Sequence, residues 1–224
     1  MDTLSEASIL SNLKTNFIGQ HVIYFPRLGS TMDTARQAAR EGAAEGTLVI
    51  AEEQTAGRGR RGRTWFLLKG GLAYSIILYP ALSQLSSLIM IASLSVVHTI
   101  ETFTSLQASI KWPNDVLINR KKVCGILIES AVKGTGVDFS IVGIGLNVNG
   151  TPPPLPPPAI PATRLSNETG KEIPRVRILY RLMEETEQLY MAVREGNSLV
   201  NEWRQRLETL GRLVQVEMDG ITIS

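Results

Sequence analysis

The residues with the most distinctive chemistry lie between Glu53 and Trp65, in the run EQTAGRGRRGRTW, which holds four arginines within six residues. Glycine lets a backbone approach a ligand closely, and the planar guanidinium group of arginine suits carboxylate and phosphate oxygens. The run could therefore wrap a phosphate-bearing ligand. A solvated basic loop and a nucleic-acid-binding segment stay open as alternatives. The run lacks the aromatic repeats of such a segment and the Gly-Lys-Ser/Thr ending of a Walker A loop.

A second unusual cluster is Lys111-Trp112-Pro113-Asn114-Asp115, which interrupts an otherwise apolar strand expected over 109–118. A proline and three polar side chains inside a core strand indicate a functional reason for the interruption. The alternative is structural: Trp112 fills the core, Pro113 lies at a bulge and Asp115 pairs with Lys111. Taken alone, the cluster supports both interpretations.

Two further segments carry candidate functional residues at strand positions. Lys122 opens an apolar strand and Gly125 follows three residues later, so the lysine could reach into a pocket or extend to water. Gly143 and Gly145 lie inside a later strand, where glycine marks a close backbone approach or a bulge. Asn147 could bind an adenine edge or satisfy the strand end. A dinucleotide fingerprint is excluded because the third glycine and the following helix are missing.

Taken together and in this order, these motifs resemble those of biotin protein ligases. The resemblance covers about Val22 to Leu165, and several independent motifs agree in both type and spacing. It is carried by Ser30-Thr31, the run from Glu53 to Arg63, the run from Lys111 to Asp115, Lys122-Val123-Cys124-Gly125, and Gly143-Ile144-Gly145-Leu146-Asn147.

The resemblance implies an activity with two steps. The carboxylate of biotin attacks the α-phosphate of ATP, with Mg2+ present, to give biotinyl-5′-AMP and pyrophosphate. A specific lysine of a biotin carboxyl carrier protein then attacks the mixed anhydride. Such chemistry needs two repelling anions to be neutralised and aligned, with no enzyme nucleophile.

The resemblance also assigns roles to the matching positions. Lys122 is expected to be the principal catalytic cation, Arg60 a second one, and Asp115 a residue that orients Lys122 or a magnesium ion; the metal ligands stay unassigned. Met32 departs from the family pattern, since many members have asparagine there. The expected biotin-binding residues are Ser30, Thr31, Met32, Gln54, Gly57, Arg58, Gly59, Arg60, Lys122 and Gly125, and the expected ATP-binding residues are Arg58, Arg60, Trp65, Asn114 and Asn147.

Two other functions remain as alternatives. The first is a lipoate or other acyl protein ligase of the same fold, which also modifies a lysine of a carrier protein. Nucleic-acid binding through the arginine-rich run is the more distant alternative, because the formal net charge of the whole chain is only +2.

The elements that must position these residues follow from apolar periodicity. Grouped strands with helices around them predict an α+β fold: a mixed, largely antiparallel sheet with helices on one side, which the resemblance makes a class II synthetase-like biotin/lipoate ligase fold. Residues 1–210 form the expected catalytic domain and 211–224 the start of a small, incomplete SH3-like β domain. Strands are expected over 21–25, 48–54, 72–78, 109–118, 123–131, 137–148 and 213–218, and helices over 5–17, 31–40, 82–100, 175–194 and 199–210.

Composition and patterning also bear on the cellular location and the partners of the chain. Cys124 is the only cysteine, so neither an internal disulfide nor a cysteine zinc site is expected, and a cytoplasmic location follows. Serines and threonines interrupt 82–100 too often for a membrane span, so we expect a buried core helix and no membrane partner. Few residues precede the first expected strand, so we expect no DNA-binding domain and no DNA partner. An exposed sheet edge favours a homodimer. The proline-rich stretch 151–161 is expected to be a surface loop.

Overall fold

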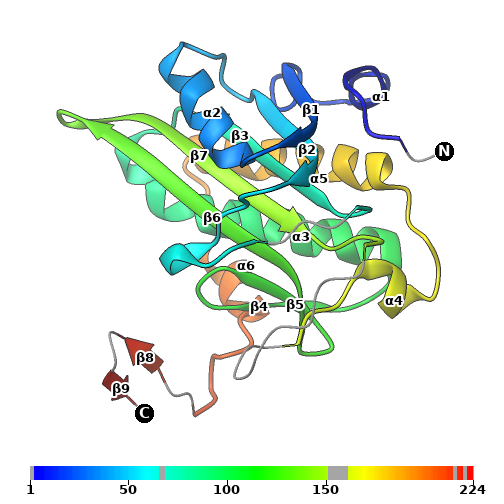
Figure 1. Cartoon of the computed structure of the whole chain (residues 1–224). Coiled ribbons are helices and arrows are strands. Elements are labelled where there is room, and N and C mark those ends of the chain that lie inside the picture. The colour runs from blue at the N-terminus through cyan, green and yellow to red at the C-terminus, as the bar shows by residue number, and fades with distance from the viewer. Residues whose placement is uncertain (1–2, 66–68, 151–160, 214–215, 219–220, 224) are drawn as a thin grey trace.

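A seven-stranded mixed sheet forms the centre of the chain (Figure 1). The computed structural model describes residues 3–65, 69–150, 161–213, 216–218 and 221–223. Neighbouring strands are antiparallel except β1 and β2, which are parallel. The predicted α+β class with a mixed, largely antiparallel sheet is confirmed. In spatial order the strands are β1 (Val22–Leu28), β2 (Leu48–Gln54), β3 (Leu72–Leu78), β7 (Gly136–Leu146), β6 (Lys121–Lys133), β5 (Asp115–Ile118) and β4 (Ala108–Lys111).

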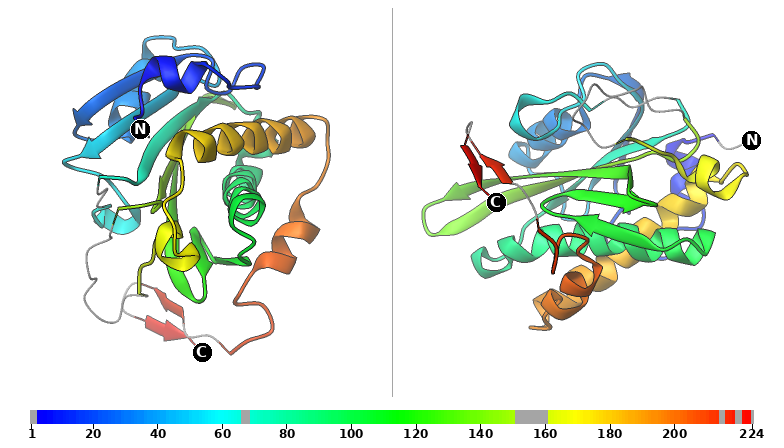
Figure 2. Two further views of the ribbon diagram at one scale, coloured as in Figure 1. Left: turned by 90° about the vertical axis from the view of Figure 1, so that its right-hand side faces the viewer. Right: turned by 90° about the horizontal axis from the view of Figure 1, so that it is seen from below.

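Helices cover both faces of this sheet, unequally. The apolar helix α3 (Leu88–Thr104) and the long helix α5 (Arg175–Arg194) share one large core with alternate residues of the central strands, among them Ile50 and Ile144. The short helix α2 (Thr31–Arg40) packs on the opposite face, against Val49, Ile77 and Ile141. The expectation of helices on one side is thus right for the main layer, and α2 is the exception (Figure 2). Three shorter helices complete the described set: α1 (Glu6–Leu10), α4 (Leu165–Thr169) and α6 (Val200–Arg206).

The expectation of a core helix over 82–100 is confirmed, with one refinement. Residues Leu82–Ser87 form a 3-10 helix, η2, and α3 follows directly. By length and hydropathy, Leu82–Thr104 could cross a membrane, but 56% of its most apolar window is buried inside the protein. Since α3 packs against both the sheet and α5, its apolar sequence is explained by the core of the chain.

The strand expected over 109–118 is wrong as a single element. It is a hairpin of β4 and β5, in which Lys111 pairs with Asp115 and the cluster Trp112-Pro113-Asn114 makes the turn. Proline has no backbone donor, so it ends a ladder more readily than it continues one. The predicted helix over 5–17 is also shorter than expected, because α1 ends at Leu10.

The C-terminal residues form a separate small sheet. Strands β8 (Val216–Met218) and β9 (Ile221–Ile223) pair in antiparallel fashion and do not join the seven-stranded sheet. The assignment of 211–224 to a second domain stays a prediction. The proline-rich stretch expected to be a surface loop falls on residues 151–160, which lie outside the described residues, apart from Pro161.

Candidate active site

The face of the sheet that carries α2 has a patch with almost no side chains. Gly143 and Gly145 of β7 lie between Ser75 and Ala73 of β3 on one side and β6 on the other, where Gly125 pairs with Gly145. Because side chains alternate along a strand, these three glycines face the same way. We call Gly125, Gly143 and Gly145 the glycine floor. A floor of bare backbone admits a flat ligand ring where any other residue would obstruct it.

Two side chains cover the glycine floor in this structure. The indole of Trp65 lies over two of the glycines: a methyl group built on Gly145 would come within 2.2 Å of Trp65 Cε2, and one on Gly125 within 2.7 Å of Cζ3. Met32, the second residue of α2, is 3% exposed and lies over the third glycine, with its sulfur 2.4 Å from a methyl group built on Gly143. Met32 therefore contributes apolar contact at this position.

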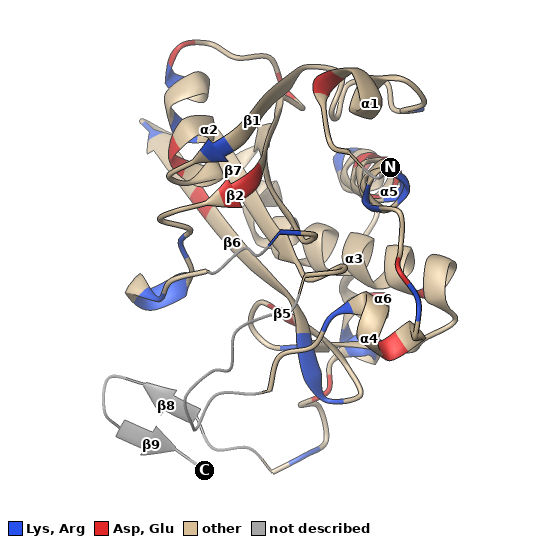
Figure 3. Ribbon diagram, turned by 45° about the vertical axis from the view of Figure 1, so that its right-hand side comes forward, with Lys and Arg blue, Asp and Glu red and all other residues tan. Residues whose placement is uncertain are grey.

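The arginine-rich segment that ends at Trp65 folds as a narrow hydrogen-bonded loop. Trp65 donates its backbone N–H to Gly57 O at 2.8 Å, and Gly59 donates to Arg63 O at 2.7 Å. A short 3-10 turn, η1 (Arg60–Gly62), closes the tip, where Arg61 has a φ of 55° and Gly62 one of 71°. The loop lies on the side of the sheet away from α3 and α5 (Figure 2), and its basic tip is blue beside β6 in Figure 3. The run from Gly57 to Trp65 is thus a loop with an exposed tip, and Arg58 and Trp65 near its two ends lie beside the glycine floor.

Lys122 lies at the edge of the floor, at the start of β6. Its ammonium group is 2.6 Å from Asp115 Oδ1, and both side chains are about one-fifth exposed. The same ammonium lies 5.4 Å from the centre of the Trp65 ring, close enough for a cation–π contact. The structure therefore brings Lys122 and Asp115 together, as the resemblance implied, and adds Trp65 to the pair.

Backbone contacts from the segment after the proline-rich stretch fix Lys122 on both sides. Lys122 donates its N–H to Pro161 O, and Thr163 donates its own to Lys122 O, each at 2.8 Å. Glu168 of α4 holds this segment by accepting hydrogen bonds from Thr163 Oγ1 at 2.6 Å and from Asn119 Nδ2 at 2.7 Å. These hydrogen bonds, the first above all, lower the pKa of Glu168. This carboxylate organises the surroundings of Lys122.

The opposite end of the floor is polar. Thr31 donates its N–H to Gln54 Oε1 at 2.8 Å and its hydroxyl to the same oxygen at 3.1 Å, while Ser75 donates to Thr31 Oγ1 at 2.9 Å. Ser30 precedes α2 as its N-cap residue, but its hydroxyl makes no capping hydrogen bond. This hydroxyl is therefore left for another partner.

Besides Asp115 Oδ1, which lies 2.6 Å from the Lys122 ammonium group, three polar atoms around the floor are buried and have no hydrogen-bond partner among the described residues: Ser30 Oγ, Arg58 Nε and Trp65 Nε1. A buried polar group without a partner costs about 1–3 kcal/mol, so native structures rarely keep one unless a ligand or water satisfies it. Because these three atoms come from residues that surround one patch, they indicate a ligand that carries both acceptors and a donor or acceptor for a hydroxyl.

The two asparagines predicted near adenine already have partners inside the chain. Asn114 donates its Nδ2 to Ile126 O at 2.9 Å and accepts from Arg60 at 3.3 Å, which links the hairpin turn to the arginine-rich loop. Asn147 is 8% exposed and donates its Nδ2 to Thr163 O at 3.0 Å. Asn114 borders the site, whereas Asn147 fixes the segment beside Lys122. Contact of either one with adenine stays a prediction.

Residues that sequence reasoning did not assign to the site surround Arg58. Its Nη2 lies 2.9 Å from Glu129 Oε2 and 3.1 Å from Asp33 Oδ1, and Arg36 contacts the same two carboxylates. Strand alternation was the available signal, because Glu129 faces the same side of β6 as Gly125. Ser75 was missed as well, because a buried serine in an apolar strand gives no sequence signal of its own.

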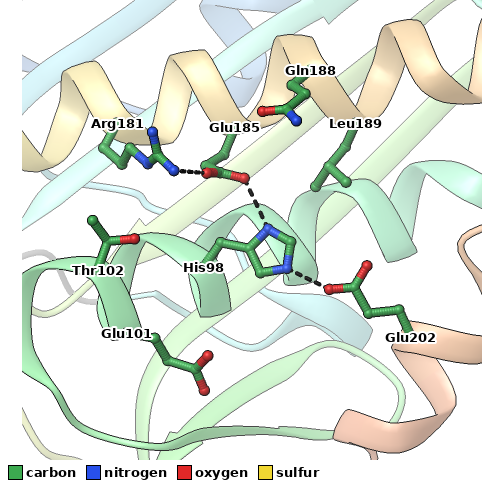
Figure 4. Close-up of a pocket in the computed structure, with 8 residues that line it drawn as sticks. All are labelled: His98, Glu101, Thr102, Arg181, Glu185, Gln188, Leu189 and Glu202. Atoms are coloured by element: carbon green, nitrogen blue, oxygen red, sulfur yellow. Dashed lines mark hydrogen bonds and ion pairs between the residues drawn. The ribbon is translucent and has the colours of Figure 1, made fainter.

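A polar hollow of about 530 Å³ lies on the other side of the sheet, between α3, α5 and α6 (Figure 4). His98 lies at its centre and bonds Glu185 through Nδ1 at 2.8 Å and Glu202 through Nε2 at 2.6 Å. The hydrogen bond to Glu185, aided by that to Glu202, raises the pKa of His98 against the effect of burial. Through these two hydrogen bonds the ring ties α3 to α5 and α6, which is a structural task. The candidate chemistry lies at the glycine floor.

The chemistry of the donor groups bears on a metal. Within the part of the chain that the structure describes, no group of three or more His, Cys, Asp or Glu side chains could hold a metal ion. Burial raises the pKa of the Cys124 thiol, so this cysteine is an apolar core residue. The site therefore offers cations and hydrogen-bond donors for an anionic ligand.

Known proteins resemble this chain in both sequence and fold. Residues 24–149 match the Biotin/lipoate A/B protein ligase family. The chain is 44% identical over 184 residues to the bifunctional ligase/repressor BirA of Bacillus subtilis, covering 80% of this chain and 57% of that protein. It is 35% identical over 202 residues to the biotin–[acetyl-CoA-carboxylase] ligase of Mycobacterium tuberculosis, covering 86% of this chain and 73% of that one.

Among solved structures, the biotin protein ligase from Aquifex aeolicus in complex with biotin and ATP matches with a TM-score of 0.76 at 30% identity, covering 91% of this chain and 85% of that one. The chain spans 57% of the length of the BirA proteins of two Bacillus species. Since the family match includes both the glycine floor and the arginine-rich loop, the chain belongs to the Biotin/lipoate A/B protein ligase family.

Proposed function

We propose that this chain is an ATP-dependent ligase that activates biotin as biotinyl-5′-AMP and transfers it to a lysine of a biotin carboxyl carrier protein. The observation that carries the proposal is the glycine floor with its surroundings: bare backbone for a flat ring, buried polar atoms without partners, and the cations Arg58, Arg60 and Lys122 at its border. The 30% identity to a ligase whose structure holds biotin and ATP supports the choice of substrates.

In the first step, an oxygen of the biotin carboxylate attacks the α-phosphorus of ATP and the bond to the β-phosphate oxygen breaks. Pyrophosphate leaves with the electron pair. Both reactants are anions, so the barrier falls when fixed cations hold them in line. Lys122 is the principal candidate for this task, because Asp115 fixes its ammonium group at 2.6 Å at the edge of the floor. Arg58 and Arg60 hold carboxylate and phosphate oxygens from the loop above.

In the second step, the amine of the carrier lysine attacks the biotinyl carbonyl and AMP leaves. The ring of biotin lies on the floor once the indole of Trp65, which packs on Gly145 and Gly125 in this structure, withdraws from it. Ser30, Thr31 and Gln54 then surround its polar head. Gly57, Gly59 and Gly125 let the backbone approach the ligand closely. The adenylate must stay shielded from water until the carrier arrives, and the loop from Gly57 to Trp65 is placed to provide that cover.

Further proposals concern partners and setting. Mg2+ enters with the nucleotide phosphates, which agrees with the absence of a ligand cluster among the described residues. A cytoplasmic location is supported by the single cysteine of the chain, and a formal net charge of only +2 argues against DNA as a partner. It forms a homodimer through the edge strand β1, because the opposite edge at β4 is already bridged by Leu207. Light scattering that finds only monomer with both substrates present would contradict the dimer.

One experiment tests the activity. Purified protein is incubated with ATP, Mg2+ and either biotin or lipoate, and the acyl-adenylate is measured by mass spectrometry. We expect biotinyl-adenylate, and transfer to a carrier protein added afterwards. Formation of lipoyl-adenylate without biotinyl-adenylate would assign the chain to the lipoate branch of the family. If neither adenylate formed, the proposed ligase activity would be refuted.

A further inference from the structure

A closed ring of four alternating charges lies beside the glycine floor. Arg58 of the loop contacts Asp33 and Glu129, and Arg36 contacts the same two carboxylates, with 3.0 Å between Arg36 Nη1 and Asp33 Oδ1. Two positive and two negative side chains make the ring neutral. It joins three elements: α2, β6 and the loop.

The ring binds Arg58 through one corner of its guanidinium only. Nη2 is the atom that contacts both carboxylates, whereas Nε is buried and has no partner among the described residues. A guanidinium is planar and rigid, so two contacts at Nη2, together with the attachment of the side chain at Nε, restrict the direction of the Nε–H bond. The ring therefore orients a buried donor that is still free to bind a ligand.

Arg36 explains how a carboxylate can lie so close to a site for anions. Glu129 alone would repel an incoming carboxylate or phosphate, but its Oε2 is shared between Arg36 and Arg58. Arg36 also contacts Asp33 three residues earlier on the same helix. Arg36 therefore offsets the negative charge of the two carboxylates that hold Arg58.

We propose that Glu129 is a positioning residue for Arg58, and that Asp33 and Arg36 complete its support. Resting on the proposed function, the inference identifies how the loop arginine is aimed at the reacting oxygens of biotin and ATP. Arg58 touches the substrates and Glu129 acts only through Arg58. The side chains of the ring are 28–54% exposed, and ion pairs exposed to this degree contribute little to stability. Loss of Glu129 should therefore affect catalysis far more than folding.

The test uses Glu129→Ala, Glu129→Gln and a matched control. Glu101→Ala removes a carboxylate of similar exposure that pairs with Arg206 at 2.7 Å, in α3 on the other face of the sheet. We expect Glu129→Ala to lower kcat/KM for biotinyl-adenylate formation about tenfold to hundredfold, as misplacement of a binding group typically does. Glu129→Gln keeps an acceptor oxygen and should fall in between. Glu101→Ala should leave the rate unchanged.

A double-mutant cycle separates positioning from a general structural effect. If Glu129 acts through Arg58, then Glu129→Ala should change the rate less than about twofold once Arg58→Ala is already present. Effects that multiply in the double variant would overturn the proposal. A wild-type rate in both Glu129 variants would overturn it as well.

Amide hydrogen exchange of residues 57–65 without ligands provides a readout that does not need the activity. We expect faster exchange in Glu129→Ala than in the wild type and Glu101→Ala, because the loop loses one of its anchors. If the wild type forms no biotinyl-adenylate, the proposed function fails while this measurement still decides whether the ring holds the loop. Equal exchange in all three proteins would overturn the anchoring role.

Discussion

Replacing Gly145 by alanine tests whether the glycine floor receives the ligand. The added methyl group would lie 2.2 Å from Trp65 Cε2 and 2.3 Å from Nε1. Carbon atoms in contact are about 3.5–4.0 Å apart, so the indole must withdraw by more than about 1 Å. The strand cannot yield instead, because Gly145 is paired with Ala73 on one side and Gly125 on the other.

The size of the effect follows from this overlap. An extra methyl group in a packed site typically costs about 1–3 kcal/mol. Trp65 is only partly buried, so the fold should lose about 1 kcal/mol and Tm should fall by about 2–4 °C for a chain of this size. The ligand meets the methyl group directly. We expect the apparent affinity for biotin to fall about 10–100-fold, since each 1.4 kcal/mol corresponds to a factor of ten.

The assay measures KM and kcat for biotinyl-adenylate formation together with thermal unfolding. Gly136→Ala is the matched control on the same strand, because a methyl group there would have its nearest neighbour 4.0 Å away. Adding Trp65→Ala to Gly145→Ala separates two causes: recovery would show that the displaced indole blocks the site, and no recovery would show that the methyl group itself does. Unchanged KM and Tm in Gly145→Ala would refute the placement of the ligand on this floor.

Three further predictions concern the surroundings of the floor. Lys122→Ala should lower the rate of adenylate formation roughly 10²–10³-fold with little change in Tm. The control Lys133→Ala, at the exposed far end of β6, should change neither the rate nor Tm. Near-normal turnover of folded Lys122→Ala would show that Lys122 has no catalytic role. The pKa of Glu168 is lowered from 4.5 on folding, so its contribution to stability is present above pH 4.5 and lost as the pH falls through the lowered pKa. Thermal unfolding of Glu168→Gln should therefore show a shallower loss of Tm on acidification than the wild type, and parallel curves would contradict the pairing. The loop 55–64 should gain protection from amide exchange when a non-hydrolysable biotinyl-adenylate analogue binds, and equal protection in both states would show that it is rigid without ligand.

The elements whose sequence had one clear period were predictable. Strands β2 and β3 and the helices α2 and α5 have the expected bounds, because their apolar residues recur at one spacing and turn residues flank them. The hairpin of β4 and β5 was not found. Its two strands together read as one apolar run, and periodicity alone cannot distinguish a turn that carries function from an interruption of one strand.

A residue of the candidate site was predictable where its type is unusual at its position in a strand or helix. Glycines inside a strand are unusual, so Gly143 and Gly145 indicated a close backbone approach from the sequence itself. A lysine at a strand start is common, and Lys122 was assigned through the family resemblance. Glu129 and Arg36 were not, because charged residues on a half-exposed strand and a surface helix are ordinary. Only the fold brings them within contact of Arg58.

The ring around Arg58 changes the physical account of the arginine-rich loop. Four neighbouring arginines suggest mutual repulsion that only a ligand could relieve. Here Arg58 is paired with Glu129 and Asp33, and Arg60 donates to Asn114, so the protein itself supplies partners for two of the four. Among the described residues, the atoms left without a partner are individual buried donors such as Arg58 Nε and Trp65 Nε1. A ligand that satisfies these atoms would be selected by the direction of its hydrogen bonds as well as by its charge.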